Sequence, residues 1–441
     1  MAGIATTVWE VRSTGNALNG GGYDTAAATT DYSNQDTAQL SLSDLTNSGI
    51  GVVDVTSTMG GFTAAMVGNY LQIASGTNDT PGFYRIVSYA STNAVALDRA
   101  PDNGAGAMTS GVCKIGGALA TLVDSHLEGT NWMIAGNTIY VKGSITTTGN
   151  LVVDNDGTQA ARITIEGYQT TRGDAPTGAS RGTIAFGAFV PSFDNYWGLK
   201  HFIATTTYTT GLRADSGALF ENVKVTNSSG TANRNALYTS SVAVTCECIS
   251  TNGDAAFIST GGELRYCNLH DSAQGLEMVG VDYAKIIGCV FDTITNQGMY
   301  GTSVTQQWSV DDCDFYNCGT AIDVVAGSRN MSIVNCIFDS NTVGIDFADA
   351  QEPQILNCCF NNNGTDVINV TLGENAVEAD PLMTDPANGD FTISAASPCH
   401  GTGLAPGTNI GLVGTYNKNI GADQTTYGGA SAHQTRLETI C

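Results

Sequence analysis

The sequence is poor in basic residues and in charge of any kind. It has 17 Lys and Arg against 41 Asp and Glu, which gives a net charge of −24 at pH 7. A surface this acidic repels phosphate groups and anionic lipid, so no nucleic-acid partner is expected. Only 13% of the residues are charged, against about 25% in an average protein. Because Lys, Glu and Arg are scarce, a helical bundle is excluded as well.

Long apolar runs are also missing. No stretch of about 18 apolar residues occurs, so we expect no membrane span. The first ten residues lack the basic and apolar regions of a secretion signal, which predicts synthesis in the cytoplasm without ordinary export. No two histidines are four residues apart, so the sequence indicates no metal site on a helix, and we expect no metal and no cofactor.

The abundant residues favour β-structure. The chain has 53 Gly among 441 residues and is rich in Thr, Asn and Ser. These residue types are common in strands and turns. We therefore predict an all-β, turn-rich protein.

An internal repeat between residues 218 and 370 sets the predicted fold. Its clearest copies are residues 331–347 (MSIVNCIFDSNTVGIDF) and 353–369 (PQILNCCFNNNGTDVIN). One small residue recurs at steps of 23, 21, 22, 24, 23 and 22, at positions Val223, Cys246, Cys267, Cys289, Cys313, Cys336 and Cys358. A leucine-rich repeat is excluded because Leu does not recur at fixed spacing. The pattern predicts a parallel β-helix whose coils stack about 4.8 Å apart, right-handed by the crossover rule.

Each copy holds two short strands with alternating faces. Two residues after the recurring small position, every copy is apolar or Cys, and we predict that this column faces the core. Its members are Val225, Cys248, Leu269, Phe291, Phe315, Phe338 and Phe360. The residue between these two inward positions is polar in some copies and apolar in others. Its apolar members, such as Val290 and Ile337, are expected to be exposed and to support lateral association of copies.

Six of the twelve cysteines lie in the recurring small column. Free Cys behaves as a small buried hydrophobe, so buried thiols are the main prediction. Disulfides between stacked coils would be strained, and zinc sites need clustered spacings that are missing here. Disulfides and metal ligands remain the alternatives.

Three regions are expected along the chain. Residues 1–116 form an N-terminal β-rich attachment region, residues 117–380 the β-helix and residues 381–441 a loop-rich closing segment. Leu and Val recur at helical spacing over residues 117–127. This segment is predicted to be a short helix that caps the open end of the β-helix.

The second strand of each copy carries the best candidate catalytic residues. Its outward column reads Glu277, Tyr300, Asp323, Asp346 and Asn369. Two carboxyls about 5–5.5 Å or about 6.5–9.5 Å apart can hydrolyse a glycosidic bond, and acids on adjacent or alternate coils approach these separations. Glu277, Asp323 and Asp346 are therefore the catalytic candidates if the protein is an enzyme. Outward acids are equally expected on any chain this acidic, so a structural role for this column stays open.

Several segments resemble known proteins. Residues 162–168 (RITIEGY), together with the Asn-Cys-x-Phe coils, resemble the pectate-lyase-like right-handed β-helix superfamily, and residues 380–382 and 419–422 resemble the closing segment of such chains. Residues 9–12 (WEVR) and 81–84 (PGFY) are similar to β-helix proteins of tailed-phage particles.

The resemblance implies a structural virion protein, which is a tail fibre, tailspike or capsid appendage of the extracellular particle. It implies a homotrimer that binds other virion proteins through its N-terminal region and contacts polysaccharide on the host surface. The superfamily includes lyases and glycosidases, so a polysaccharide-degrading enzyme of tailspike type is one alternative, and a bacterial surface adhesin is another. Pectate-lyase chemistry needs Asp-bound calcium and a basic residue on neighbouring coils. No such constellation is recognisable, which favours the structural role.

Overall fold

The computed structural model describes residues 4–122, 133–147, 149–153, 155–189, 191–230, 235–258, 261–281, 283–301, 307–325, 330–349 and 353–403. Two compact units divide the chain, Met1–Thr205 and Thr206–Cys441. In the described residues the regular structure is β-strand apart from short 3-10 turns, as predicted. None of the described helical segments has the length and apolar character needed to cross a membrane.

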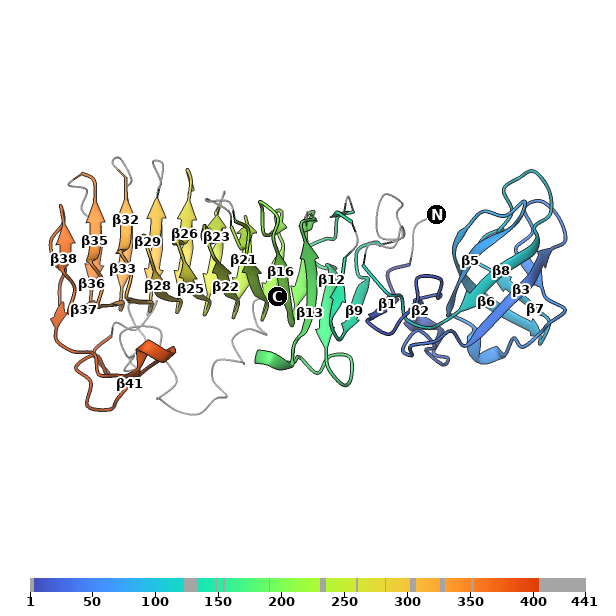
Figure 1. Cartoon of the computed structure of the whole chain (residues 1–441), viewed down its shortest axis with the longest axis horizontal. Coiled ribbons are helices and arrows are strands. Elements are labelled where there is room, and N and C mark those ends of the chain that lie inside the picture. The colour runs from blue at the N-terminus through green and yellow to red at the C-terminus, as the bar shows by residue number, and fades with distance from the viewer. Residues whose placement is uncertain are drawn as a thin grey trace, which may run out of the picture. The chain divides into compact units, whose positions relative to one another are not determined.

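The first unit contains a closed antiparallel barrel (Figure 1, blue to cyan). Its strands are β3 (Leu40–Asn47), β4 (Asp54–Thr56), β5 (Tyr70–Thr77), β6 (Gly82–Ser91), β7 (Ala94–Leu97) and β8 (Thr109–Ile115). Alternating apolar residues such as Leu71, Ile73 and Ile86 are fully buried inside it. The barrel accounts for the β-rich N-terminal region expected from the sequence.

The parallel β-helix begins earlier in the chain than the predicted boundary at residue 117. Strand β1 (Thr7–Arg12) pairs in parallel with β9 (Thr138–Lys142), which pairs with β12 (Ile163–Tyr168). Trp9 and Val11 of β1 are buried. Residues 1–116 are therefore not wholly separate from the solenoid, because β1 forms its first coil before the chain enters the barrel. The other strands of this unit include β2 (Gly22–Asp24), β10 (Ile145–Thr146), β11 (Leu151–Val153), β13 (Gly182–Gly187), β14 (Pro191–Phe193), β15 (Trp197–Lys200) and β16 (Phe202–Thr206).

The predicted capping helix is wrong where the structure describes it. Residues 117–122 are not helical, and Leu119 forms a parallel bridge to Val11. Leu119 and Leu122 are buried in this extended path, so their spacing reflects burial and not a helical face. Residues 123–127 of the predicted helix lie outside the described part of the chain.

A buried ionic cluster ties β1 to other parts of the first unit. The carboxylate of Glu10, which is 0% exposed, accepts a hydrogen bond from Arg12 at 2.6 Å and one from Arg172 at 2.8 Å. The Tyr168 hydroxyl donates to Glu10 as well. Arg172 also forms an ion pair with Asp31 at 2.6 Å. The cluster therefore joins β1, the end of β12, the loop after β12 and the segment before the barrel.

The second unit is a stack of coils with three parallel sheets (Figure 1, green to orange). The first sheet contains β18 (Leu219–Glu221), β21 (Val242–Val244), β24 (Glu263–Arg265), β27 (Lys285–Ile287), β30 (Ser309–Asp311), β33 (Ser332–Val334) and β36 (Gln354–Leu356). The second sheet contains β19 (Lys224–Asn227), β22 (Glu247–Ser250), β25 (Asn268–Ser272), β28 (Val290–Ile294), β31 (Asp314–Tyr316), β34 (Ile337–Asp339), β37 (Cys359–Asn361) and β39 (Val377–Glu378). The third sheet contains β17 (Leu212–Ala214), β20 (Leu237–Thr239), β23 (Asp254–Ile258), β26 (Gln274–Met278), β29 (Gln297–Gly301), β32 (Thr320–Val324), β35 (Val343–Phe347) and β38 (Thr365–Ile368).

The inward aromatic column of the second sheet lies in the predicted register. Phe291 pairs with Phe315, Phe315 with Phe338, and Phe338 with Phe360. Their rings stack with centroids 4.6, 5.1 and 5.0 Å apart, and interplanar angles stay at or below 10°. Stacked, buried rings of this kind hold successive coils in one register.

The six cysteines of the repeat fill a turn between the first and second sheets. In each of these turns a residue with left-handed backbone precedes the cysteine, for example Asn335 (φ 55) before Cys336 and Asn357 (φ 52) before Cys358. Asn adopts this conformation more readily than most residues. All six thiols are buried and free, as predicted. Burial raises the pKa of the Cys336 and Cys358 thiols well above the ordinary value, so they are poorly ionised.

We expect the column thiols to be unreactive in the folded protein, because all six are buried and a disulfide reagent cannot reach them. Thiol counting with a chromogenic disulfide reagent, with and without denaturant, measures this. The six cysteines should react only after unfolding. Rapid reaction of several of them under native conditions, or their absence from the denatured count because they are oxidised, would contradict the arrangement.

A closing segment covers part of the second sheet. The hairpin β40 (Met383–Asp385) and β41 (Asp390–Ile393) brings Ile393 against Ile337 and Cys359. Ile337 is consequently 1% exposed. The expectation that Ile337 is exposed and available for lateral association is therefore wrong, because the chain's own C-terminal segment occupies that face. Residues 404–441 of the predicted closing segment lie outside the described residues.

Candidate functional site

The predicted acidic column lies on the outer face of the third sheet. Glu277 pairs with Tyr300, Tyr300 with Asp323, and Asp323 with Asp346. Asn369 was predicted as the next member, but Asp346 pairs with Ile368. The predicted alignment of the last strand is therefore wrong by one residue, and Asn369 takes a left-handed conformation just after the strand. The structure thus brings together the three candidate acids, Glu277, Asp323 and Asp346.

The same column continues over earlier coils that the sequence pattern did not align. Glu277 pairs with Phe257, Phe257 with Tyr238, and Tyr238 with Arg213. The rings of Tyr238 and Phe257 are stacked with centroids 5.0 Å apart. The guanidinium of Arg213 lies over the Tyr238 ring at 4.9 Å and pairs with Asp215 at 3.1 Å.

A second outward row lies at the start of the same strands. It contains Asp254, Gln274, Gln297 and Thr320. On each strand two residues lie between the two rows, and the first of them is Ala or Gly. A Cβ added at Gly275 would lie 2.2 Å from the carbonyl oxygen of Gly298, which shows how closely the coils approach there. Small residues at this position therefore allow the close approach of the coils.

Side chains of neighbouring coils contact one another, both within the second row and diagonally between the rows. Within the second row, Gln274 Nε2 donates to Gln297 Oε1 at 3.2 Å. Diagonally, Gln297 Nε2 donates to Asp323 Oδ2 at 3.2 Å. The Asp254 carboxyl is the equivalent diagonal neighbour of Glu277, which acts on its pKa. Each carboxylate of the acidic column except Asp346 is thus positioned by a polar residue of the preceding coil.

Asp254 has the most unusual environment of the site. It is 1% exposed, and its Oδ1 atom has no hydrogen-bond partner among the described residues. Burial raises the pKa of Asp254 to about 7, and the neighbouring charge of Glu277 and the hydrogen bond between the two carboxyls add to this shift. Burial also raises the pKa of Asp323; the hydrogen bond from Gln297 opposes this, and the charge of Asp346 adds to it.

Asp254→Asn should stabilise the protein increasingly as the pH rises. The folded protein keeps the Asp254 proton up to about pH 7, whereas the unfolded chain releases it near the ordinary Asp value. The native state therefore loses stability between these pH values, and Asn removes this loss. We expect a gain of about 4 kcal/mol at pH 8 and little gain near pH 4, measured by chemical denaturation. Asp54→Asn, an exposed change on the barrel, is the control. A gain of equal size at both pH values would show that Asp254 is not a buried proton carrier.

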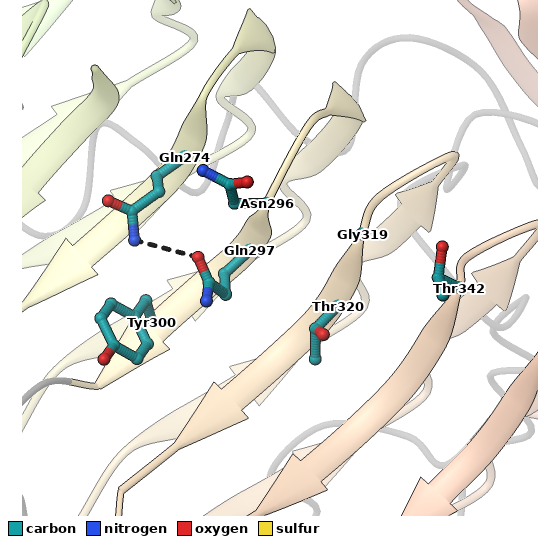
Figure 2. Close-up of a pocket in the computed structure, with 7 residues that line it drawn as sticks. All are labelled: Gln274, Asn296, Gln297, Tyr300, Gly319, Thr320 and Thr342. Carbon is teal, nitrogen blue, oxygen red and sulfur yellow. Dashed lines mark hydrogen bonds between the residues drawn. The ribbon is translucent and has the colours of Figure 1, made fainter. Parts of the chain in front are cut away.

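An open pocket of about 480 Å³ adjoins the column. Figure 2 shows Gln274 and Gln297 joined by their hydrogen bond, with Tyr300 farther along the same strand as Gln297. Asn296, Thr320 and Thr342 line it from neighbouring turns and strands. The pocket therefore offers one tyrosine ring with its hydroxyl, three amides and two threonine hydroxyls beside the acidic column, a set that suits the hydroxyl groups of a sugar.

Sequence reasoning missed Asp254, Gln274 and Gln297. The repeat is visible in the sequence at the inward apolar positions. These three polar residues lie at strand starts, where the spacing to the preceding turn varies, so they do not follow that repeat. The available signal was the recurrence of Gln before a Gly at 274–275 and 297–298.

Comparison with known proteins supports the fold. A family model described as a right-handed β-helix region matches residues 211–381. Among solved structures, pectate lyase Pel9A is similar with a TM-score of 0.50 and 13% sequence identity, covering 69% of this chain and 91% of that one. The catalytic domain of a GH87 alpha-1,3-glucanase in complex with nigerose gives a TM-score of 0.30 and 10% identity, over 78% of this chain and 91% of that one. No curated protein sequence matches the chain.

At such low identity these similarities concern the fold alone. The coil repeat, the three parallel sheets and the family match agree with one another. The solenoid of this chain is a right-handed parallel β-helix of pectate-lyase-like fold.

Proposed function

We propose that the second unit binds a polysaccharide along the outer face of the third sheet and hydrolyses it between Glu277 and Asp323. The observation that carries the proposal is the Asp254 carboxyl, which is 1% exposed, has an Oδ1 atom without a hydrogen-bond partner among the described residues and has its pKa raised by burial beside Glu277. A carboxyl that keeps its proton near neutral pH, beside a second carboxyl that reaches solvent, suits general acid catalysis. If the acids of this column were only solvated surface charges, no buried carboxyl would be needed beside them.

In this proposal the proton held by Asp254 passes through the Glu277 carboxylate to the glycosidic oxygen, as the bond from that oxygen to the anomeric carbon breaks. Asp254 supplies the hydrogen bond that keeps a proton on the carboxyl pair. Asp323 accepts a proton from a water molecule, whose oxygen forms the new bond to the anomeric carbon. One water is consumed, and solvent then returns the proton from Asp323 to the Asp254–Glu277 pair.

The spacing of the acids favours inversion of configuration. Glu277 and Asp323 lie two coils apart, which is about 9.6 Å at the backbone. This is close to the upper end of the separation of about 6.5–9.5 Å that is typical of inverting glycosidases. Tyr300 lies between them and offers a ring for a sugar to pack on. Asp323 and Asp346, about 4.8 Å apart, approach the separation used in retention but lack a buried acid partner.

Elimination by a lyase mechanism is less compatible with this face. A lyase needs a base to remove a proton from the sugar, commonly Arg or Lys. The described outward rows of the third sheet contain no Lys or Arg from Tyr238 to Ile368. Hydrolysis by carboxyl groups is therefore the reaction that these residues support.

Digestion of a panel of bacterial surface polysaccharides tests the proposal. Reducing ends measure cleavage, and proton NMR of the first product gives its anomeric configuration. We expect cleavage with inversion, and its loss in Asp323→Asn. Retention would indicate the Asp323–Asp346 pair instead, and binding without any reducing ends would contradict hydrolysis.

We also propose that this β-helix is carried on a tailed-phage particle as a trimeric appendage, attached through its N-terminal region. The resemblance of residues 9–12 and 81–84 to phage β-helix proteins supports this placement. Host-surface polysaccharide would then be the glycan that the third sheet contacts. Light scattering should give three times 45.7 kDa, and antibodies should label particles. A monomer absent from purified particles would contradict it.

A further inference from the structure

We propose that the glycan bound by the third sheet carries no anionic groups, so that polyuronates and sulfated or phosphorylated polymers are excluded. This inference rests on the proposed function and adds the substrate class. It separates this chain from its structural neighbour Pel9A, which is by name a pectate lyase.

The charge of the binding face is the first argument. Three carboxyls, those of Glu277, Asp323 and Asp346, lie in the outward column on three of four successive coils. A polyuronate laid along the column would place carboxylates near these acids. Because the whole chain has a net charge of −24, no distant positive field compensates this repulsion.

The positions of the basic residues are the second argument. Arg213 is the basic member of the described outward column, and it lies three coils before Glu277, or about 14 Å along the stack. Its guanidinium is already paired with Asp215 at 3.1 Å and lies over the ring of Tyr238. It is therefore poorly placed to hold an anionic sugar at the acids.

The groups that remain at the pocket are neutral. Gln274, Gln297 and Asn296 provide amides, and Thr320 and Thr342 provide hydroxyls. Each can donate or accept a hydrogen bond to a sugar hydroxyl. Neutral groups of this kind satisfy the hydroxyls of an uncharged sugar. They offer no counter-charge to the carboxylate of an anionic sugar, which would stay unpaired, and this is the physical basis for selection against anionic sugars.

A matched pair of polymers tests the inference. The uncharged polysaccharide from the panel that binds most tightly is compared with the same polymer after selective oxidation of its primary hydroxyls to carboxylates. Native polyuronates are measured alongside. We expect at least about tenfold weaker binding of the oxidised polymer at low salt, with a smaller difference at high salt.

Variants connect the effect to the acidic face. Asp346→Asn should reduce the difference between the two polymers, whereas Glu378→Gln, an exposed change on the second sheet, should leave it unchanged. Equal or tighter binding of the oxidised polymer, or cleavage of polyuronates alone, would overturn this inference while leaving a polysaccharide hydrolase. If no polysaccharide binds, the proposed function fails and this inference fails with it.

Discussion

Glu277→Gln should lower polysaccharide hydrolysis by about 10²–10⁴-fold, which is the usual contribution of a general acid. Gln has nearly the same shape as Glu and can still contact Asp254, but it cannot donate a proton to the leaving oxygen. Binding of the glycan should therefore change little, and the loss should fall on turnover. The wild-type rate should also decline above about pH 7, where Asp254 loses its proton. The variant should not show that decline.

The matched control for this change is Glu378→Gln, which makes the same substitution on an exposed strand of the second sheet. It should keep full activity. Near wild-type turnover in Glu277→Gln would remove the general acid from the proposed mechanism. Equal losses in both variants would indicate a general effect on the fold and would equally argue against a special role for Glu277.

Glu10→Ala should destabilise the first unit by about 3–5 kcal/mol, the typical effect of removing one partner from a buried ion pair. Glu10 is 0% exposed and accepts hydrogen bonds from Arg12 and Arg172. Its removal leaves two guanidinium groups without their shared counterion in the interior. The donor hydroxyl of Tyr168 also loses its acceptor. Thermal and chemical denaturation measure the loss.

Asp54→Ala, an exposed change on the barrel, is the control and should change stability little. Glu10→Gln should fall between the two, because it keeps the shape but not the charge. An unchanged unfolding midpoint in Glu10→Ala would show that the cluster does not hold β1 against the following coils.

Much of the β-helix could be predicted from the sequence because its core repeats. Phe315, Phe338 and Phe360 fill equivalent inward positions, so their spacing reports the coil length directly. The cysteines follow the same logic, since each occupies the inward position of an equivalent turn. Equivalent positions in successive coils of a solenoid bury similar residues, so the repeat length is visible in a single sequence.

The incorrect predictions concern residues whose burial is not set by the coil repeat. In the last coil Ile368 follows Cys358 by ten residues, as Asp346 follows Cys336, so Ile368 lies beside Asp346 and the predicted alignment of Asn369 was wrong by one residue. Leu119 and Leu122 have helical spacing but are buried in a non-helical segment, in which Leu119 forms a bridge to Val11 of β1. Ile337 was expected at the surface because the hairpin that covers it comes far later in the chain. Contacts between distant segments of this kind leave no local pattern.

The candidate site was predictable only in part for a related reason. Glu277, Asp323 and Asp346 share a column set by the strand alternation. Asp254 is the first residue of its strand and becomes notable only through burial and its contact with Glu277. Burial of a polar side chain depends on the neighbouring coils, so an acidic residue of this kind cannot be told from a solvated one by spacing alone.

The central claim is that a glycan lies on the third sheet between Glu277 and Asp323. A crystal structure of Glu277→Gln with an oligosaccharide from the bound polysaccharide tests it most directly. We expect the sugar chain to cross Tyr300, with a glycosidic oxygen within hydrogen-bond distance of residue 277 and a water beside Asp323. An oligosaccharide bound on the first or second sheet, with the third sheet empty, would contradict the account.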